Sequence, residues 1–111
     1  MSKDGKTTRI RELNDAFRQS FTGGRVMLTS GVNELTDDVK AKVLEAVRTF
    51  KDFDGDNDPH KEHDFGMVEV DGERCFFKLD YYDCDMHHGS EDPSDPQQTC
   101  RVMTIMLASE Y

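Results

Sequence analysis

The stretch from Phe65 to Tyr82 reads FGMVEVDGERCFFKLDYY, and it decides the fold. Residues Phe65 to Val70 and Arg74 to Tyr82 are rich in aromatic and β-branched side chains, which favours two strands. Asp71-Gly72 stands between them and is a preferred pair for a tight hairpin turn. The sequence therefore predicts a β-hairpin, in which the start of the first strand and the end of the second lie side by side.

N-terminal to the hairpin, the spacing of apolar residues predicts two helices and a strand. From Thr7 or Thr8 onward, apolar residues recur every three or four positions, which is typical of a helix with one buried face: Ile10, Leu13, Phe17 and Phe21. The residues expected to face outward on this helix are Arg9, Arg11, Glu12, Arg18 and Gln19. Gly23-Gly24 is expected to stop it. A short strand over residues 25–30 and a turn over residues 31–35 follow.

Thr36 is the expected N-cap of the second helix, because a side-chain hydroxyl can accept from a free backbone N–H group. Its buried face is expected to hold Val39, Val43, Val47 and Phe50. After the hairpin, residues 99–108 form an apolar segment that predicts a central strand covered on both faces. The order α-β-α-β-β-β predicts an α+β fold, with two helices packed on one face of a four-stranded, mainly antiparallel sheet.

The chain has 111 residues, which is room for one hydrophobic core, so we expect a single domain over residues 7–111 after a flexible tail of residues 1–6. No apolar run is long enough to span a membrane, and the N-terminus lacks the apolar region of a secretory signal. The three cysteines are widely spaced and odd in number, which does not indicate a disulfide framework. These features predict a cytoplasmic protein without a membrane partner.

Negative charge is concentrated in one part of the chain. The formal net charge is −9, yet residues 52–95 alone hold 15 acidic and three basic residues, a balance of −12. Direct binding of nucleic acid is disfavoured there, because lysine and arginine provide the attraction to phosphate. Cations and proteins with a basic surface are the expected partners, and nucleic-acid-binding complexes carry such surfaces.

Two polar loops, residues 52–64 and 83–98, carry most of this charge, and the predicted hairpin brings them to one end of the sheet. We call them the first and second acidic loops. The candidate residues of an acidic binding surface are Asp52, Asp54, Asp56, Asp58, Glu62, Asp64, Asp80, Asp83, Asp85, Glu91 and Asp92. Acidic groups spaced in this way can imitate a phosphate backbone, although acidic loops also serve only to keep a small protein in solution.

The same loops hold all four histidines and one cysteine, so a divalent-metal-binding protein, with or without hydrolytic activity, is the alternative interpretation. Its candidate ligands are His60, His63, Asp64, Asp83, Cys84 and His87. The segment that starts at Asp52 lacks two requirements of an EF-hand calcium loop, because Asn57 replaces the glycine and His63 replaces the final glutamate. No hydrolase or phosphate-loop motif is present, so an enzymatic function is not favoured.

Several short motifs together resemble those of a family of short bacterial proteins of unknown function. They are Asn57-Asp-Pro59, Glu62-His-Asp-Phe-Gly66, Asp80-Tyr-Tyr-Asp83, Gly89-Ser90, Asp92-Pro93, Asp95-Pro96, Arg101-Val102 and the segment from Thr104 to Tyr111. The resemblance begins near Ile10 and runs to Tyr111. Members of that family are often encoded on plasmids and other mobile elements.

The resemblance implies a context for function. Small proteins on mobile elements often act on host machinery, including restriction and CRISPR defences. Together with the charge distribution, this predicts a non-enzymatic protein-binding modulator, of the anti-CRISPR or anti-restriction type, that acts through its acidic surface. His63, Asp64, Asp80 and Asp83 fall inside the family-like motifs, whereas Cys84, His87 and His88 do not.

Overall fold

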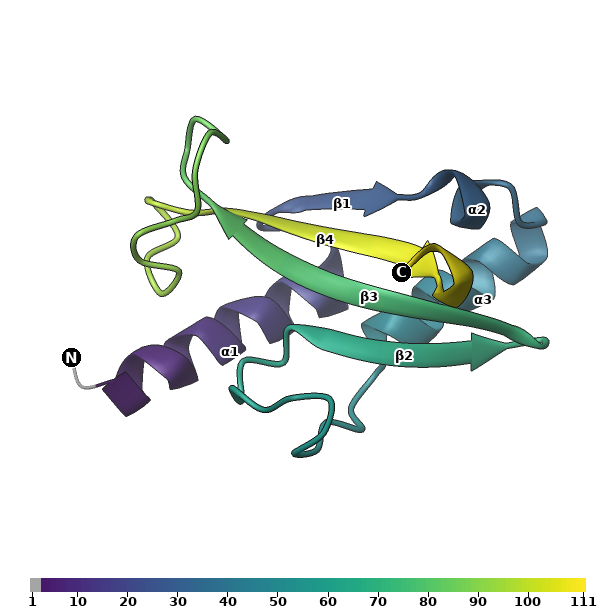
Figure 1. Ribbon diagram of the computed structural model, residues 1–111, viewed down its shortest axis with the longest axis horizontal. Coiled ribbons are helices and arrows are strands. Elements are labelled where there is room, and N and C mark those ends of the chain that lie inside the picture. The colour runs from purple at the N-terminus through teal and green to yellow at the C-terminus, as the bar shows by residue number, and fades with distance from the viewer. Residues whose placement is uncertain (1–2) are drawn as a thin grey trace.

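The computed structural model describes residues 3–111, and the predicted α+β fold is confirmed (Figure 1). The elements in chain order are α1 (Lys3–Ser20), β1 (Arg25–Leu28), α2 (Ser30–Asn33), α3 (Asp37–Arg48), β2 (Phe65–Val70), β3 (Glu73–Tyr82), β4 (Cys100–Leu107) and the short 3₁₀ helix η1 (Ala108–Glu110). Residues 3–6 of the expected tail form the first turn of α1, and residues 1–2 lie outside the described part. In place of the expected turn at residues 31–35, the single-turn helix α2 is formed.

The hairpin lies where the sequence predicts it. β2 and β3 pair antiparallel, with Phe65 opposite Lys78 and Val70 opposite Glu73. Asp71 and Gly72 have φ angles of 51° and 83°, so both turn residues occupy the left-handed region that this pair tolerates. The local sequence is therefore sufficient to set this turn and its register.

The sheet has the strand order β1-β4-β3-β2, which makes β4 central as expected. β4 pairs antiparallel with β3 and parallel with β1, so the final strand joins the hairpin to the N-terminal strand. The sheet is thus mixed, although two of its three pairings are antiparallel.

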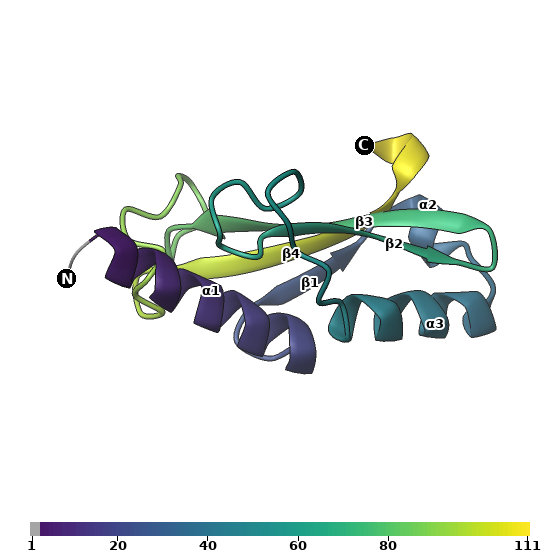
Figure 2. The same cartoon turned by 90° about the horizontal axis from the view of Figure 1, so that it is seen from below.

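Both long helices lie on one face of the sheet (Figure 2). The Thr36 hydroxyl accepts from the backbone N–H of Val39 and caps α3, as predicted. α1 ends differently from the expectation, because Phe21 and then Gly23 take positive φ angles of 58° and 98°. Gly24 is needed for close packing, since a Cβ atom there would lie 2.7 Å from the carbonyl oxygen of Arg101.

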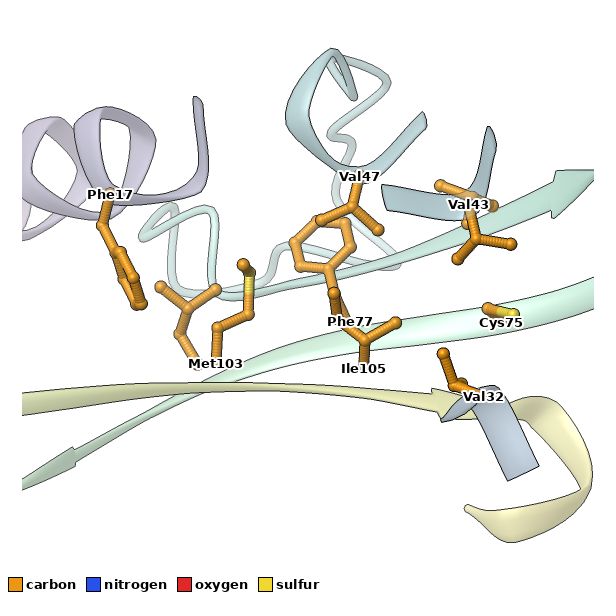
Figure 3. Close-up of a cluster of buried hydrophobic side chains, with 10 residues drawn as sticks. Phe17, Val32, Val43, Val47, Cys75, Phe77, Met103 and Ile105 are labelled. Carbon is orange, nitrogen blue, oxygen red and sulfur yellow. The ribbon is translucent and has the colours of Figure 1, made fainter. Parts of the chain in front are cut away.

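The hydrophobic core lies between the two helices and the sheet (Figure 3). Its fully buried members come from α1, α2, α3, β3 and β4 and include Phe17, Val32, Val43, Val47, Cys75, Phe77, Met103 and Ile105. Val43 and Val47 are therefore confirmed as core residues of α3, and Val39 packs against the core while partly buried. Burial raises the pKa of the Cys75 thiol, and the negative charges of Glu73 and Glu110 raise it further.

The structure corrects the expectation for Arg18. Its side chain does not face outward, because it is 2% exposed and lies over the rings of Phe53 and Phe77. The expectation that β4 is covered on both faces is confirmed. α1 and α3 lie on one side of the sheet (Figure 2), and on the other side Val102 and Met106 are only 8% and 5% exposed. No helix in residues 3–111 is long and apolar enough to cross a membrane.

Candidate functional site

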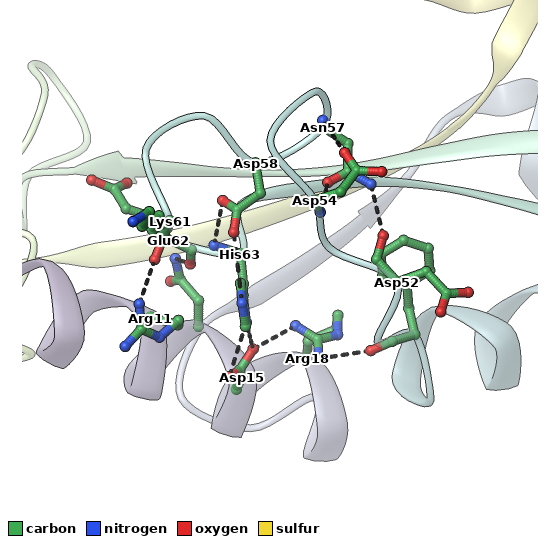
Figure 4. A network of polar contacts seen from close by, with 12 residues as sticks. Arg11, Asp15, Arg18, Asp52, Asp54, Asn57, Asp58, Lys61, Glu62 and His63 are labelled. Atoms are coloured by element: carbon green, nitrogen blue, oxygen red, sulfur yellow. Dashed lines mark hydrogen bonds and ion pairs between the residues drawn. The ribbon is translucent and has the colours of Figure 1, made fainter.

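The first acidic loop is attached to α1 through His63 (Figure 4). The imidazole Nδ1 lies 2.8 Å from a carboxylate oxygen of Asp15, and Nε2 lies 3.6 Å from Asp58 on the other side. Asp58 also accepts from the backbone N–H of His63 and is only 6% exposed. His63 thus has a carboxylate at each ring nitrogen, so its role here is to hold the loop on the helix.

Arg18 and Phe53 complete this contact from the core side. The guanidinium of Arg18 donates to Asp15 at 2.9 Å and to the carbonyl oxygen of Phe50 at 3.1 Å. The ring of Phe53 stacks on the imidazole of His63 with a centroid separation of 3.8 Å. The buried guanidinium of Arg18 is therefore paired with a carboxylate and lies against aromatic rings, an arrangement that offsets the cost of taking its charge out of water.

Asn14 joins the first acidic loop to the sheet. Its amide nitrogen donates to the carbonyl oxygen of Glu62 at 2.9 Å and to the hydroxyl of Tyr81 at 2.7 Å. Its amide oxygen accepts from Nε of Arg101 at 2.8 Å. The Tyr81 hydroxyl in turn donates to the Glu62 carboxylate. Burial raises the pKa of Tyr81 and lowers the pKa of Arg101, so the phenol stays protonated while it donates.

The second acidic loop is tied to the same group. Arg101 donates to the carbonyl oxygen of Pro93, and its guanidinium lies over the ring of Tyr81. Lys6 on α1 forms an ion pair with Asp92 at 3.6 Å. The pKa of Asp92 is held below its usual value, chiefly by the hydroxyl of Ser94. Asn14 and Arg101 thus connect both acidic loops to α1 and β4.

The carboxylates of the expected acidic surface fall into three groups: those that accept hydrogen bonds, the two residues Asp80 and Asp64, and those without a role in the fold. Carboxylates that serve the fold accept from nearby backbone or side-chain donors, as Asp54 does from the N–H groups of Asp56 and Asn57. The others in this group are Asp58, Glu62, Asp83 and Asp92. Asp80 forms an ion pair with Lys78, and half-buried Asp64 has a pKa raised by burial. Four exposed carboxylates have no such role: Asp52, Asp56, Asp85 and Glu91.

The candidate metal ligands do not form one group. In residues 3–111, no three His, Cys, Asp or Glu side chains are arranged to hold a metal ion. His63 is held by two carboxylates, the Cys84 thiol donates to the carbonyl oxygen of Gln97, and Asp83 accepts from the backbone N–H of His87. The remaining candidate ligands are the exposed imidazoles of His60 and His87 and the half-buried carboxylate of Asp64.

A cleft of about 320 Å³ lies beside the His63 contact. Its walls come from α1 and the first acidic loop, and they include Arg11, Phe53, Asp54, Asp58 and Lys61. Arg11 closes one side by donating to the carbonyl oxygen of Lys61 at 3.1 Å. The cleft therefore mixes charges of both signs around a buried carboxylate.

Sequence reasoning missed the residues of α1 that organise this site, namely Asn14, Asp15 and Arg18. A signal was present for two of them. Asn14 and Arg18 share the i, i+4 spacing of the buried stripe with Ile10 and Phe17, so the polar residues stand on the apolar face of the helix. Asp15 gave no such signal, because only the folded chain brings it to His63.

Comparison with known proteins adds a family. Residues 28–110 match the family described as Protein of unknown function (DUF3768). The chain belongs to this family. The matched segment of this DUF3768 protein contains both acidic loops, the hairpin and β4, whereas α1 and most of β1 precede it. No curated protein and no solved structure matches the chain.

Proposed function

We propose that this DUF3768 protein is a non-enzymatic protein-binding modulator whose acidic loops capture a basic surface of another protein. The observation that carries the proposal is the group of exposed carboxylates without a role in the fold: Asp52, Asp56, Asp85 and Glu91. Carboxylates that remain free keep their full charge for a partner. The proposed partner is a host nucleic-acid-handling or defence complex, and the gene is proposed to travel on mobile elements.

Preorganisation of the loops supports this proposal. Asn14, His63 and Arg101 connect the two loops to α1 and β4, so the free carboxylates are carried on a backbone that is already fixed. The free-energy cost of ordering the loops when a partner binds is therefore small. Clustered charge of one sign also accelerates encounter with a surface of the opposite sign.

The test compares two variants of equal charge. The loop variant carries Asp52→Asn, Asp56→Asn, Asp85→Asn and Glu91→Gln. The matched control carries four exposed substitutions outside the acidic loops: Glu12→Gln, Glu34→Gln, Glu45→Gln and Glu73→Gln. Each variant is used to capture host proteins from a fraction that binds heparin, and an excess of duplex DNA is then added as a competitor.

Wild type and the matched control are expected to capture the same proteins and to release them to duplex DNA. The loop variant is expected to capture at least about tenfold less, since each lost charge pair removes a fraction of a kcal/mol or more. Equal capture by the loop variant and the control would contradict the proposal. Substitution of Asp54 and Asp58 is avoided, because both carboxylates hold the first acidic loop.

A further inference from the structure

The face of the sheet opposite the two long helices is the largest part of the molecule without a described function. Alternation along the strands places fourteen residues on this open face: Arg25, Met27, Phe65, Met67, Glu69, Arg74, Phe76, Lys78, Asp80, Tyr82, Cys100, Val102, Thr104 and Met106. Figure 1 looks onto it, and Figure 2 shows it edge-on, with α1 and α3 on the other side.

The composition of the open face is unusual for a surface in contact with water. An antiparallel sheet with one wet face normally alternates apolar and polar residues. Here ion pairs, Glu69 with Arg74 and Lys78 with Asp80, lie on either side of one apolar cross-strand row. That row consists of Met106, which is 5% exposed, half-buried Phe76 and exposed Met67. Met27 and Met67 are 54% and 45% exposed, and Tyr111, whose ring packs against Phe65 and Phe76, is 75% exposed.

A shallow groove of about 400 Å³ crosses this face where β1, β4 and β3 meet the second acidic loop. Its walls include Arg25, Met27, Val102, Thr104, Tyr82 and Met86. Four of the six methionines of the chain therefore lie on the open face or in its groove. Flexible, polarisable methionine side chains adapt to varied apolar partners, which is why they are frequent on binding surfaces.

Charge decides which partner suits this face. A second copy of the chain would bring together two molecules of net charge −9, which opposes association. The second acidic loop provides both Met86 of the groove wall and the free carboxylate of Asp85. The apolar docking surface thus has negative charge at the edge formed by the second acidic loop, while Arg25 lies in the opposite wall of the groove. The complementary ligand is apolar along the groove and basic at the end that meets the loop.

We infer that the open face binds an amphipathic, basic segment of a partner protein. Apolar side chains of that segment lie on Met27, Met67 and the groove, and its lysines and arginines face the second acidic loop. This inference rests on the proposed function, because it identifies the kind of basic surface that the acidic loops attract. It adds an apolar contact that the acidic loops alone do not provide.

The experiment uses a synthetic helical peptide of leucine and lysine with one tryptophan on its apolar side. The protein contains no tryptophan, so the indole emission reports only on the peptide. The open-face variant carries Met27→Gln and Met67→Gln at exposed positions. The control carries Ala16→Gln and Ala41→Gln, which are exposed on the helices. The loop variant described above and a scrambled peptide of the same composition complete the set.

Wild type and the control are expected to shift the emission to the blue with equal affinity. The open-face variant and the loop variant are each expected to bind about tenfold more weakly, which corresponds to partial loss of methionine burial and of charge attraction. The inference would be overturned if only the loop variant bound the peptide more weakly, or if the scrambled peptide bound equally well; neither result contradicts the proposed function. The inference would also be overturned if wild type formed a dimer in sedimentation that the open-face variant abolished, because the occupant of the open face is then a second copy.

Absence of binding by wild type would also overturn the inference. A different result would contradict the proposed function: duplex DNA does not compete, and the loop variant and the matched control capture host proteins equally.

Discussion

At the scale of single residues, Asn14 stands out because its side chain joins three separate parts of the fold. One amide side chain, 0% exposed, bonds to the first acidic loop, to Tyr81 on β3 and to Arg101 on β4. Its amide nitrogen and amide oxygen are both used, so no other side chain of this size can replace it. Each partner is itself buried or half-buried and depends on the bond.

Asn14→Leu is expected to destabilise the protein by about 2–4 kcal/mol, because Arg101 and Tyr81 lose a partner inside the protein. Urea unfolding followed by circular dichroism measures this change. Asn33→Ala, at an exposed asparagine of α2, is the control and is expected to change stability by less than about 0.5 kcal/mol. Equal effects of the two substitutions would show that the Asn14 contacts contribute little.

Glu110 predicts a pH dependence. Its carboxylate accepts from the hydroxyl of Thr29 and from the N–H groups of Leu107 and Gly31, and these bonds hold its pKa below the ordinary value. A depressed pKa in the folded state contributes stability above the ordinary carboxyl pKa, and this contribution is lost as pH falls through the folded value.

Glu110→Gln is therefore expected to lower the melting temperature by a few degrees at pH 7. In acid the melting temperatures of wild type and variant should converge, because the wild-type carboxyl group is then protonated and, like the amide of glutamine, carries no charge. Calorimetric scans across this pH range provide the measurement. A difference that stays constant down to acid pH would show that the charge of Glu110 has no part in the effect.

At the scale of elements, local chemistry decided what could be predicted. The hairpin and the cap of α3 depend on neighbouring residues, and both lie where the sequence indicates. α2 was missed, since four residues give no periodic pattern. The sequence predicts an outward position for Arg18, because arginine is rarely buried. Only the folded chain brings Asp15, Phe53 and Phe77 around its side chain. The sequence predicts a surface role for all the candidate loop carboxylates, yet four of them accept from backbone N–H groups of their own loops: Asp54, Asp58, Asp83 and Asp92.

The close packing of Gly24 between α1 and β4 leads to a prediction at the scale of elements. Gly24→Ala introduces a Cβ atom 2.7 Å from the carbonyl oxygen of Arg101 and 2.8 Å from the ring of Phe17. Because both neighbours belong to the packed core, a loss of about 1–3 kcal/mol is expected in urea unfolding. Gly55→Ala is the matched control, since its Cβ atom meets nothing within 4 Å. A neutral Gly24→Ala would show that β1 can move away from α1 at no cost.

At the scale of the whole molecule, charge is distributed asymmetrically. Like charges within and between the acidic loops repel each other in the folded protein, and salt at 0.1 M largely screens this repulsion at separations beyond about 10 Å. The loop variant is therefore expected to melt at a higher temperature than wild type in low salt, and the advantage should shrink as salt is added. A loop variant that is less stable than wild type in low salt would mean that the four carboxylates serve the fold after all.

β1 has only four residues and is hydrogen-bonded to the sheet on one side, through its parallel pairing with β4. Edge strands of this kind open first in thermal fluctuations, so the amide hydrogens of β1 should exchange with deuterium earlier than those of β3. Each opening exposes the backbone of β4 beside Met103 and Ile105, which is an apolar strand with a free edge. Such an edge is a template for pairing with another chain. We therefore expect concentrated solutions of this protein to aggregate faster under conditions in which β1 opens more often.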